Sequence, residues 1–442
     1  MSSRPSVLVL GGGPAGATAG AVLARHGVQV KIFEKTRFPR HHVGESLQPA
    51  TFRLLDEHLG IGGRFAAAGF ARKYGAVYVW GESREPWSVL FDDRLEQDLP
   101  GLDEAGLLAG DYEHAWQVDR ATFDHMLLEA ARQEGAAVTE TAEATRILRD
   151  GARVVGAEIR MPDGRLVEHH ADFVLDCTGQ RCMVGRALGM TRLVSDLQAT
   201  ATYGYYDDAG GIEGPLGRHV QLVVSTPEGW AWFIPTSPTR TSVGVVCNSR
   251  ERLSLERFEA IIHAAGLPTR DGRLVDEGRG PLRFARDWSF THKRFAGPGW
   301  FLVGDAACFV DPILSGGVDF AVRGGCAAAL AVLQAQDPTA ASAGGVSARY
   351  DQRLRAEYRA YLKLARYWYG NNRSVDGLFW TAHESVHATN IATPMRAFVY
   401  LTTGHYAADR HFKVFARWQE EKMFRALGVD ADALRDTRSP AD

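Results

Sequence analysis

The sequence predicts an α/β fold, in which a parallel-sheet domain is interrupted by a second β-sheet domain and followed by a helical C-terminal region. Three observations predict it. A glycine-rich turn joins an apolar strand to a helix near the N-terminus, β-type patterns dominate residues 186–294, and helical periodicity returns after the low-complexity stretch 336–348. A second domain inserted into the first accounts for this order of patterns.

The first 34 residues have the pattern of a Rossmann-like βαβ unit. An apolar strand at 6–10 leads into a glycine-rich turn, a helix at 17–26, a second strand at 28–33 and then Glu34. Such glycines allow a tight turn and close approach of a pyrophosphate to the helix N-terminus, and the acid accepts hydrogen bonds from a ribose. A glycine-rich turn in an unrelated α/β protein is the alternative. The turn residues expected at the dinucleotide are Gly11, Gly13, Pro14, Ala15 and Gly16.

The segment after this unit is harder to assign. Residues 38–46 are too polar for a core, and a helix with leucines on one face follows them. Neighbouring histidines on an extended segment rarely share a metal, so His41 and His42 predict no metal site. Residues 74–90 alternate as strands do. Residues 91–113 hold eight acids and one arginine, which predicts a solvated loop.

The rest of the chain alternates between the two domains. A helix is expected at 121–132, a hairpin at 145–158 and 165–170, and a strand at 173–176. The inserted domain is expected to contain strands at 220–225, 230–235 and 242–246 and a helix at 258–265. Amphipathic helices are expected at 350–369 and 410–427. The predicted boundaries are 1–75, 105–185 and 295–335 for the first domain, 76–104 and 186–294 for the second, and 345–430 for the helical region.

Composition narrows the classes of partner. The chain of 442 residues has a net charge of −3, which gives no basic surplus for a nucleic-acid partner. Its five cysteines are an odd number without metal-type spacing, so we expect reduced thiols and a cytoplasmic protein. No signal peptide is visible, and no apolar run approaches the ~18 residues of a membrane span, so no membrane partner is expected.

Residues 300–318 hold the second glycine-rich site. An apolar strand runs into Gly304-Asp305, an irregular segment ends at Pro312, and a glycine pair at 316–317 opens a small-residue helix. A helix N-terminus presents unpaired N–H groups and partial positive charge. The stretch is therefore expected to hold something negative.

These motifs resemble those of FAD-dependent monooxygenases and, more narrowly, of flavin-dependent halogenases. The first glycine turn, Arg120 and Gly304-Asp305 resemble the FAD-binding fold over roughly residues 5–335. The stretch 230–235 matches the halogenase signature Trp-x-Trp-x-Ile-Pro, and 309–317 resembles Phe-x-x-Pro-x-x-Ser-x-Gly. Lys73 falls where the family carries its essential lysine. The overall pattern is similar to the branch that acts on phenols, pyrroles and aromatic polyketides, often tethered to a carrier protein.

The resemblance implies a full set of site residues. FAD, reduced to FADH2 by a separate flavin reductase, would react with O2, and the oxidant would convert chloride or bromide into hypohalous acid. Lys73 would relay that oxidant to the aromatic substrate, and Trp230 and Trp232 would separate the substrate from the flavin. The halide would meet Ser315, Gly316, Gly317 and Val318. The implied FAD-binding residues are Gly11, Gly13, Pro14, Ala15, Gly16, Glu34, Arg40, Glu45, Ser46, Arg120, Asp305, Pro312, Gly317 and Val318.

Alternatives remain open at several of these positions. The family commonly has Ser-Ser-Gly-Val where this chain has 315–318 as Ser-Gly-Gly-Val, which bears on halide affinity. Lys73 alone reads as a surface lysine, and a sheet core would also explain the two tryptophans. The C-terminal aromatic residues could line the substrate pocket or pack in the core; they are Tyr358, Tyr361, Tyr367, Trp368, Tyr369, Phe379 and Trp380.

Two other functions compete with halogenation. One is an NAD(P)H-dependent FAD aromatic monooxygenase, although residues 176–179 lack the Asp-Gly dipeptide typical of that class and no second dinucleotide fingerprint is present. The other is a catalytically silent flavoprotein that binds a biosynthetic partner. Residues 350–425 hold a surplus of basic over acidic residues, which suits docking of an acidic carrier protein.

Overall fold

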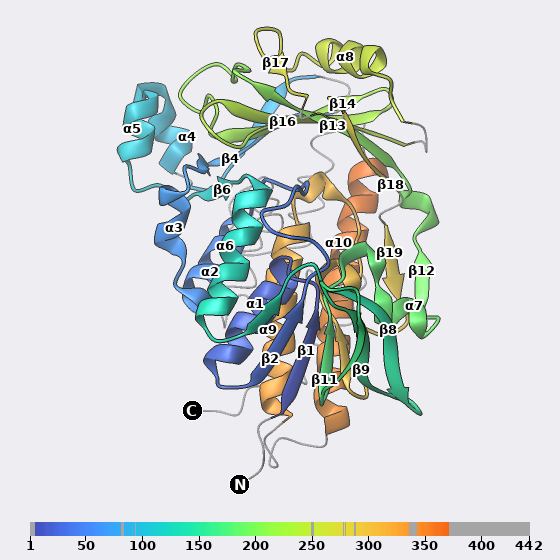
Figure 1. The fold of residues 1–442 in the computed structure, drawn as a ribbon. Coiled ribbons are helices and arrows are strands. Elements are labelled where there is room, and N and C mark those ends of the chain that lie inside the picture. Colours follow the sequence, from blue (N-terminus) through green and yellow to red (C-terminus); the bar gives the residue numbers. More distant parts are fainter. Residues whose placement is uncertain are drawn as a thin grey trace, which may run out of the picture.

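The computed structural model describes residues 5–370, apart from 81–83, 93, 249–251, 277, 279, 287–288 and 336–342. A mainly parallel sheet with helices packed on it forms one half of the molecule, and a larger, mainly antiparallel sheet lies across the other end (Figure 1). The expected helix at 410–427, together with Phe379 and Trp380, lies outside the described residues. The mixed α/β class predicted from the sequence is confirmed.

The parallel sheet is built around the N-terminal βαβ unit. Its strands, in spatial order, are β20 (Ala296–Gly297), β21 (Trp300–Leu302), β11 (Phe173–Asp176), β1 (Ser6–Leu10), β2 (Gln29–Phe33) and β7 (Ala137–Thr139). All neighbours are parallel except β20 and β21. Val7 to Leu10 of β1 are all buried, as expected for a central strand covered on both faces.

Three helices pack together on one face of this sheet: α1 (Pro14–Arg25), α6 (Arg120–Gln133) and α9 (Gly317–Gln334). A Cβ added at Gly325 would lie 2.7 Å from the carbonyl oxygen of Ala15, so a glycine is needed where α9 crosses α1. The two helices that begin at glycine-rich turns therefore run side by side, with both turns at the same edge of the sheet (Figure 1).

The other face is covered by a three-stranded antiparallel sheet. Its strands are β8 (Glu143–Asp150), β9 (Arg153–Arg160) and β10 (Leu166–His170). The predicted hairpin is thus incomplete, because its first segment folds back on itself at 151–152 to make two strands. Val154, Ala157 and Ile159 of β9 are fully buried and belong to the main core.

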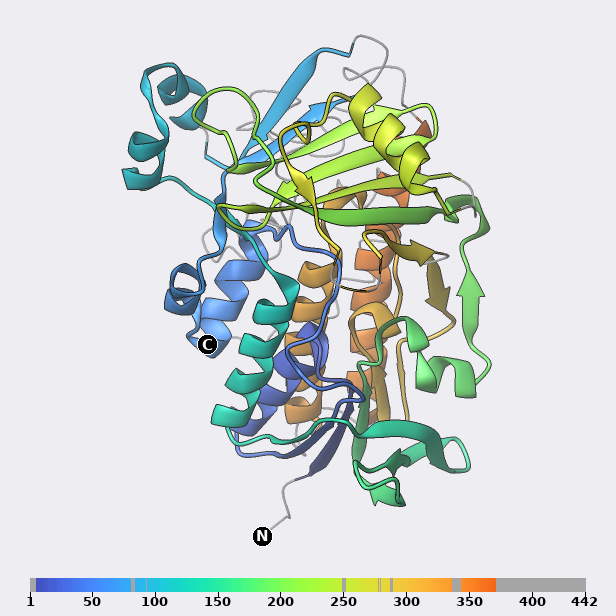
Figure 2. The same cartoon turned by 45° about the horizontal axis from the view of Figure 1, so that its top comes forward.

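The antiparallel sheet has two distinct faces. Its strands are β17 (Arg273–Leu274), β13 (Thr200–Asp207), β16 (Arg240–Cys247), β15 (Gly229–Pro235), β14 (Val220–Thr226), β4 (Gly75–Val79) and β5 (Pro86–Leu90), with β18 (Arg283–Arg286) paired to β13. Helix α8 (Leu255–Ala264) covers one face, where Phe258, Ile261 and Ile262 pack on alternating apolar residues of the strands (Figure 2). The opposite face is turned toward the parallel-sheet half.

Shorter elements complete the fold. Two small sheets pair β3 (Ala71–Lys73) with β6 (Ala115–Gln117) and β12 (Thr191–Leu193) with β19 (Phe290–His292). The remaining helices are α2 (Pro49–Leu59), α3 (Gly62–Ala67), α4 (Arg94–Asp98), α5 (Glu104–Ala109), α7 (Met183–Ala187), α10 (Ala343–Gly370) and the 3₁₀ turns η1 (Leu99–Gly101), η2 (Gly179–Arg181), η3 (Ser195–Leu197), η4 (Gly304–Ala306) and η5 (Pro312–Leu314).

The predicted solvated loop at 91–113 is wrong. The segment forms α4, η1 and α5, and Leu95 and Leu107 are fully buried in a cluster with Tyr74 and Leu216. Asp103 caps α5 by accepting the Gly106 N–H at 2.7 Å. Although the segment is rich in acids, its leucines form one apolar side. This side packs on the antiparallel-sheet half of the protein as the segment runs to Ala109.

Helix α9 is long and apolar enough to cross a membrane, with a mean hydropathy of 1.2 over 18 residues. No apolar run of that length was expected from the sequence. Since 72% of this helix is buried inside the protein, its hydrophobicity is explained by packing in the core.

Candidate active site

The first glycine turn is shaped to receive a dinucleotide. A Cβ at Gly11 would collide with the carbonyl oxygen of Cys177, and one at Gly16 with that of Gly11. The N-cap residue of α1, Gly13, has no side chain with which to cap the helix, and the first turn of α1 holds no acid. Its free N–H groups therefore face outward from a turn that has no room for side chains, as a pyrophosphate site requires.

Glu34 is fixed at the end of β2. Its carboxylate accepts the N–H of Gly12 at 2.8 Å and both the N–H and the hydroxyl of Thr36, at 2.9 and 2.6 Å. A carboxylate has about four acceptor positions, so three bonds orient the group and leave one position for a ribose hydroxyl. This geometry is compatible with the predicted role.

The flavin segment, residues 40–48, is held in place by Arg120. The guanidinium binds Asp124 through two hydrogen bonds of 2.8 and 3.0 Å and donates to the carbonyl oxygens of Val43 and Gly44 at 2.7 and 3.2 Å. Arg40 joins the same carboxylate at 3.3 Å. Most of the Arg120 donors are thus used within the protein, so we infer that it serves the cofactor by shaping this segment.

The end of the flavin segment pairs with strand β6. Val118 N–H donates to Glu45 O at 2.8 Å, and Leu47 N–H donates to Trp116 O at 3.0 Å. The hydroxyl of Ser46 is buried and has no partner among the described residues. An orphaned buried hydroxyl is the kind of group that a bound cofactor satisfies, and the turn and segment together fit FAD.

Lys73 is buried beside this segment. Its side chain is on β3, which pairs with β6, and only 3% of the residue is exposed. The amine donates to Leu47 O at 3.2 Å and lies 5.2 Å from the centre of the Phe91 ring. Burial lowers the pKa of the amine to about 7. The surface alternative is therefore excluded, and a large fraction of the amine is neutral near neutral pH.

An aromatic surface faces the flavin segment from the antiparallel sheet. Cross-strand pairing aligns Tyr78, Val223, Trp232, Gly244 and Tyr203 in one row, so their side chains share a face. This face is opposite to the one covered by α8. The sheet therefore has a packed apolar side and a second side that carries aromatic rings toward the parallel-sheet half.

Trp230 and Trp232 lie on this aromatic face, as their spacing predicts. Their ring centres are 5.7 Å apart. Trp232 donates its indole N–H to the Ser242 hydroxyl at 3.1 Å, and Trp230 donates to the Tyr369 hydroxyl at 2.8 Å. A Cβ at Gly244 would collide with the Trp232 ring, so that glycine makes room for the indole to lie across β16.

The predicted halide segment forms a short bridge between the two halves of the protein. Ser315 has a φ of 52°, and its hydroxyl donates to the side-chain oxygen of Gln221 on β14 at 3.1 Å. Gly316 is the N-cap residue of α9 and has no side chain with which to cap the helix, and the acid of the first turn, Asp319, is paired with Arg323 at 2.7 Å. The N–H groups of Gly317 and Val318 thus stand at the start of a long helix, where an anion is favoured.

A small cavity of about 30 Å³ adjoins this helix start. It is lined by Asp305, Cys308, Phe309, Val310, Asp311, Gly316, Gly317, Phe320, Tyr358 and Tyr361. Burial raises the pKa of Asp305 to about 7 even though Arg120 opposes the shift. The Gly-Asp acid and the glycine pair, predicted separately from the sequence, therefore meet at one place in the structure.

Comparison with known proteins identifies this arrangement. The family model described as tryptophan halogenase matches residues 6–102 and 94–438. A tryptophan 2-halogenase of Chondromyces crocatus is 32% identical over 403 residues, which cover 88% of this chain and 72% of that protein. A 1H-pyrrole-2-carbonyl peptidyl-carrier-protein chlorinase of Pseudomonas fluorescens is 33% identical, over 72% of this chain and 73% of that one.

This chain belongs to the flavin-dependent halogenase family. The solved structure of a myxobacterial chondrochloren halogenase, described as a new variant of FAD-dependent halogenases, has the same fold with a TM-score of 0.75 and 30% identity, covering 95% of this chain and 97% of that one. The halogenase resemblance inferred from the motifs is thus confirmed.

Several residues of the halogenase site were not predicted from the sequence. Gln221 binds Ser315, Gly244 accommodates Trp232, and Tyr205 donates its hydroxyl to Glu45 at 2.7 Å. Burial raises the pKa of Glu45, while the Tyr205 hydroxyl bond opposes that shift. Alternation along residues 200–207 could have pointed to the tyrosines of β13, but no local signal marks Gln221.

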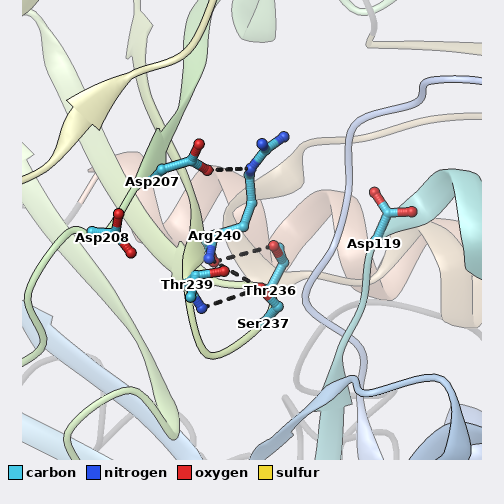
Figure 3. A pocket seen from close by; sticks show the side chains of 7 residues that line it. All are labelled: Asp119, Asp207, Asp208, Thr236, Ser237, Thr239 and Arg240. Carbon is cyan, nitrogen blue, oxygen red and sulfur yellow. Dashed lines mark hydrogen bonds and ion pairs between the residues drawn. The ribbon is translucent and has the colours of Figure 1, made fainter.

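A larger cavity of the halogenase, of about 540 Å³, has a different set of lining residues (Figure 3). It is lined by Asp119, Asp207, Asp208, Thr236, Ser237, Thr239 and Arg240. Asp207 is neutralised by Arg240 at 2.7 Å and Arg273 at 2.9 Å, and Asp119 lies across from them at the start of α6. None of these residues belongs to the predicted flavin or halide site.

Proposed function

We propose that this halogenase takes FADH2 from a separate flavin reductase and uses O2 with chloride or bromide to halogenate an electron-rich aromatic compound. The substrate class is a phenol, a pyrrole or an aromatic polyketide, free or tethered to a carrier protein, as in natural-product biosynthesis. The observation that carries the proposal is the buried Lys73 amine, with a pKa of about 7, beside the flavin segment. The five cysteines are free and buried, which supports a cytoplasmic enzyme.

Different residues of the chain would bind the halide and separate the substrate from the flavin. Bound and reduced FAD supplies the electrons with which O2 becomes an oxidant for the halide. The N–H groups at Gly317 and Val318 would hold the halide, since a helix start attracts an anion without a competing cation. Trp230 and Trp232 would exclude the substrate from direct contact with the flavin.

Lys73 would transfer the halogen from the flavin side of Trp230 and Trp232 to the substrate side. In its neutral form the amine can take the halogen from hypohalous acid: an N–halogen bond forms, the O–halogen bond breaks, and the oxygen leaves with an amine proton as water. The aromatic carbon would then take the halogen, and the ring proton would restore the amine. In its protonated form the amine can instead donate a hydrogen bond to hypohalous acid. A pKa near 7 makes both forms available at neutral pH. Phenols and pyrroles are electron-rich, so a separate carboxylate base is not required on the acceptor side.

Relatives support the substrate class at a coarse level. The Pseudomonas fluorescens relative acts on a pyrrole held by a carrier protein, and the Chondromyces crocatus relative on tryptophan. At about 30% identity these names do not transfer to this chain. Its aromatic sheet face, with Tyr78 stacked on Trp87 at 4.5 Å, suits a planar ring.

The test is product analysis by mass spectrometry. The enzyme is supplied with FAD, a reductase, NADH, and chloride or bromide, and is presented with free and carrier-tethered phenols, pyrroles and indoles. We expect a mass increase and isotope pattern of one halogen on a phenol, pyrrole or polyketide. Halide-independent addition of oxygen would instead identify the enzyme as an aromatic hydroxylase.

A further inference from the structure

One face of helix α10 packs directly against the 309–317 loop. Tyr358, Tyr361, Ala365 and Tyr369 are spaced by three, four and four residues, so they share a side of the helix. Tyr358 and Tyr361 line the small cavity at the start of α9. A Cβ added at Gly316 would lie 2.5 Å from the Tyr361 ring, so the loop and the helix are in close contact.

Tyr369 links this loop to the tryptophan pair. The indole N–H of Trp230 donates to the Tyr369 oxygen at 2.8 Å, and the Tyr369 hydroxyl donates to Asp311 Oδ2 at 3.0 Å. The other oxygen of Asp311 accepts the N–H of Ile313 at 2.9 Å, which holds the 3₁₀ turn η5. An indole can only donate, so the direction of the whole chain of hydrogen bonds is fixed.

The Tyr369 hydroxyl stays protonated at neutral pH. Burial, followed by the nearby charge of Asp311, raises its pKa well above the ordinary value. The hydroxyl is therefore available as a donor to Asp311 under the conditions of an enzyme assay. Sequential hydrogen bonds of one direction also reinforce one another in a poorly solvated site.

We propose that Tyr369 is a positioning residue, whose hydroxyl fixes the Trp230 indole relative to the 309–317 loop. Helix α10 thereby closes one side of the space between the start of α9, at Gly317, and the aromatic face of the antiparallel sheet. The inference rests on the proposed function, in which that loop holds the halide. Tyr369 is one of the C-terminal aromatic residues expected to line the pocket or to pack in the core, and the fold brings its hydroxyl to Trp230 and Asp311.

A specific defect follows when the bridge is removed. Without the hydroxyl, the indole of Trp230 loses its acceptor and can rotate, and Asp311 loses one of the bonds that hold η5. Halide binding weakens because the amides at the start of α9 are no longer held in place. Oxidant is also lost to water, since the partition beside the flavin is loosened.

The test compares Tyr369→Phe with Tyr350→Phe. Tyr350 is on the same helix, is buried, and donates one hydrogen bond of 2.8 Å to Leu302 O, which is not part of the 309–317 loop. Both variants lose a buried phenolic hydroxyl. We expect Tyr369→Phe to raise the KM for halide about tenfold and to increase peroxide release per product, with an unchanged rate of flavin reoxidation. Tyr350→Phe should lower only the thermal midpoint.

A second readout does not depend on turnover. The tryptophan emission spectrum of flavin-free protein should differ between wild type and Tyr369→Phe, and this difference should vanish in a Trp230→Phe background. A spectral difference that persists without Trp230, or equal halide KM in the two tyrosine variants, would overturn the inference. A wild type that makes no halogenated product would refute the proposed function, while the emission cycle would still decide whether Tyr369 holds Trp230.

Discussion

The side-chain amine of Lys73 is buried at a position where its protonated, charged form is unfavourable. Among the described residues, its amine contacts Leu47 O at 3.2 Å and the Phe91 ring. One carbonyl and one ring do not replace the hydration of a full charge. The shift of the pKa to about 7 is the consequence, and it makes this residue chemically competent at the expense of stability.

Replacing Lys73 should therefore stabilise the fold in a pH-dependent way. Below pH 7 the amine is protonated in both the folded and the unfolded protein, and the penalty of burying its charge is fully present. Between pH 7 and the ordinary value of 10.5 the unfolded chain binds more protons, so wild-type stability rises with pH. We expect Lys73→Met to unfold at a higher urea concentration than wild type at pH 6, with a gap that narrows toward pH 10.

Urea unfolding of the two proteins at several pH values checks this. Lys31→Met is the matched control, because Lys31 is on an exposed position of β2. A gap between wild type and Lys73→Met that stays constant from pH 6 to 10 would contradict the assigned pKa.

At the scale of single residues, some features of the site could be predicted from the sequence and others could not. Gly11, Gly16 and Glu34 could be placed because local spacing determines their geometry. The burial of Lys73 could not be predicted, because it depends on Leu47, β6 and Phe91 meeting around one strand of three residues.

At the scale of elements, β16 shapes the tryptophan pair. Gly244 leaves the space in which the Trp232 ring lies, and Ser242 binds its N–H at 3.1 Å. We expect Gly244→Ala to displace the indole, lower the yield of halogenated product and raise peroxide release per flavin oxidised. Overpacking costs about 1–3 kcal/mol, so yields are compared per folded, flavin-loaded enzyme.

The control for this change is Gly63→Ala, since a Cβ at Gly63 in helix α3 meets nothing within 4 Å. If Gly244→Ala couples flavin oxidation to product as well as Gly63→Ala does, the Trp232 ring does not act as a partition.

The start of α9 gives a second test at this scale. Gly317 is the first residue of the helix, so its N–H has no partner within the helix. Gly317→Pro removes one amide donor, so we expect the KM for halide to rise by about 10- to 100-fold. Gly317→Ala is the matched control, because it adds the same Cβ, 3.1 Å from Phe309, and keeps the N–H.

Halide titration of both variants at equal FAD content measures whether the proline variant has the higher halide KM. Equal halide KM values for the proline and alanine variants would mean that this amide does not bind the halide.

Elements with strong periodicity were predictable, and those that depend on tertiary packing were not. The strands around 220–246 are short apolar runs that are buried on both faces. Helix α8 is amphipathic and buries Phe258, Ile261 and Ile262. Helices α4 and α5 were missed, since their buried leucines are too few to show a period and only packing against Tyr74 and Leu216 orders them.

At the scale of the whole molecule, the parallel sheet offers one dinucleotide fingerprint, at β1 and α1. Within the described residues, the larger sheet is almost wholly antiparallel and faces the flavin segment with aromatic rings. We therefore expect the purified enzyme alone to oxidise NADH and NADPH negligibly, with or without substrate. Absorbance at 340 nm measures this, and rapid substrate-stimulated oxidation would favour the hydroxylase class.

The sequence could predict that two halves exist and which motifs each carries. It could not predict that Gln221, Tyr205 and Tyr369 join them, because these residues come from strands and a helix far apart in the chain. Their contacts become visible only when the aromatic face, the flavin segment and the 309–317 loop are assembled.

The central claim is that flavin oxidation and halogen transfer are separate steps connected by the Lys73 amine. The most direct test measures the flavin reoxidation rate and the halogenated product together, for wild type, Lys73→Ala and Lys73→Arg at equal FAD occupancy. We expect reoxidation near the wild-type rate in all three and no product from either variant, because alanine has no amine and a guanidinium stays charged. Product from Lys73→Ala at near wild-type yield would contradict the claim.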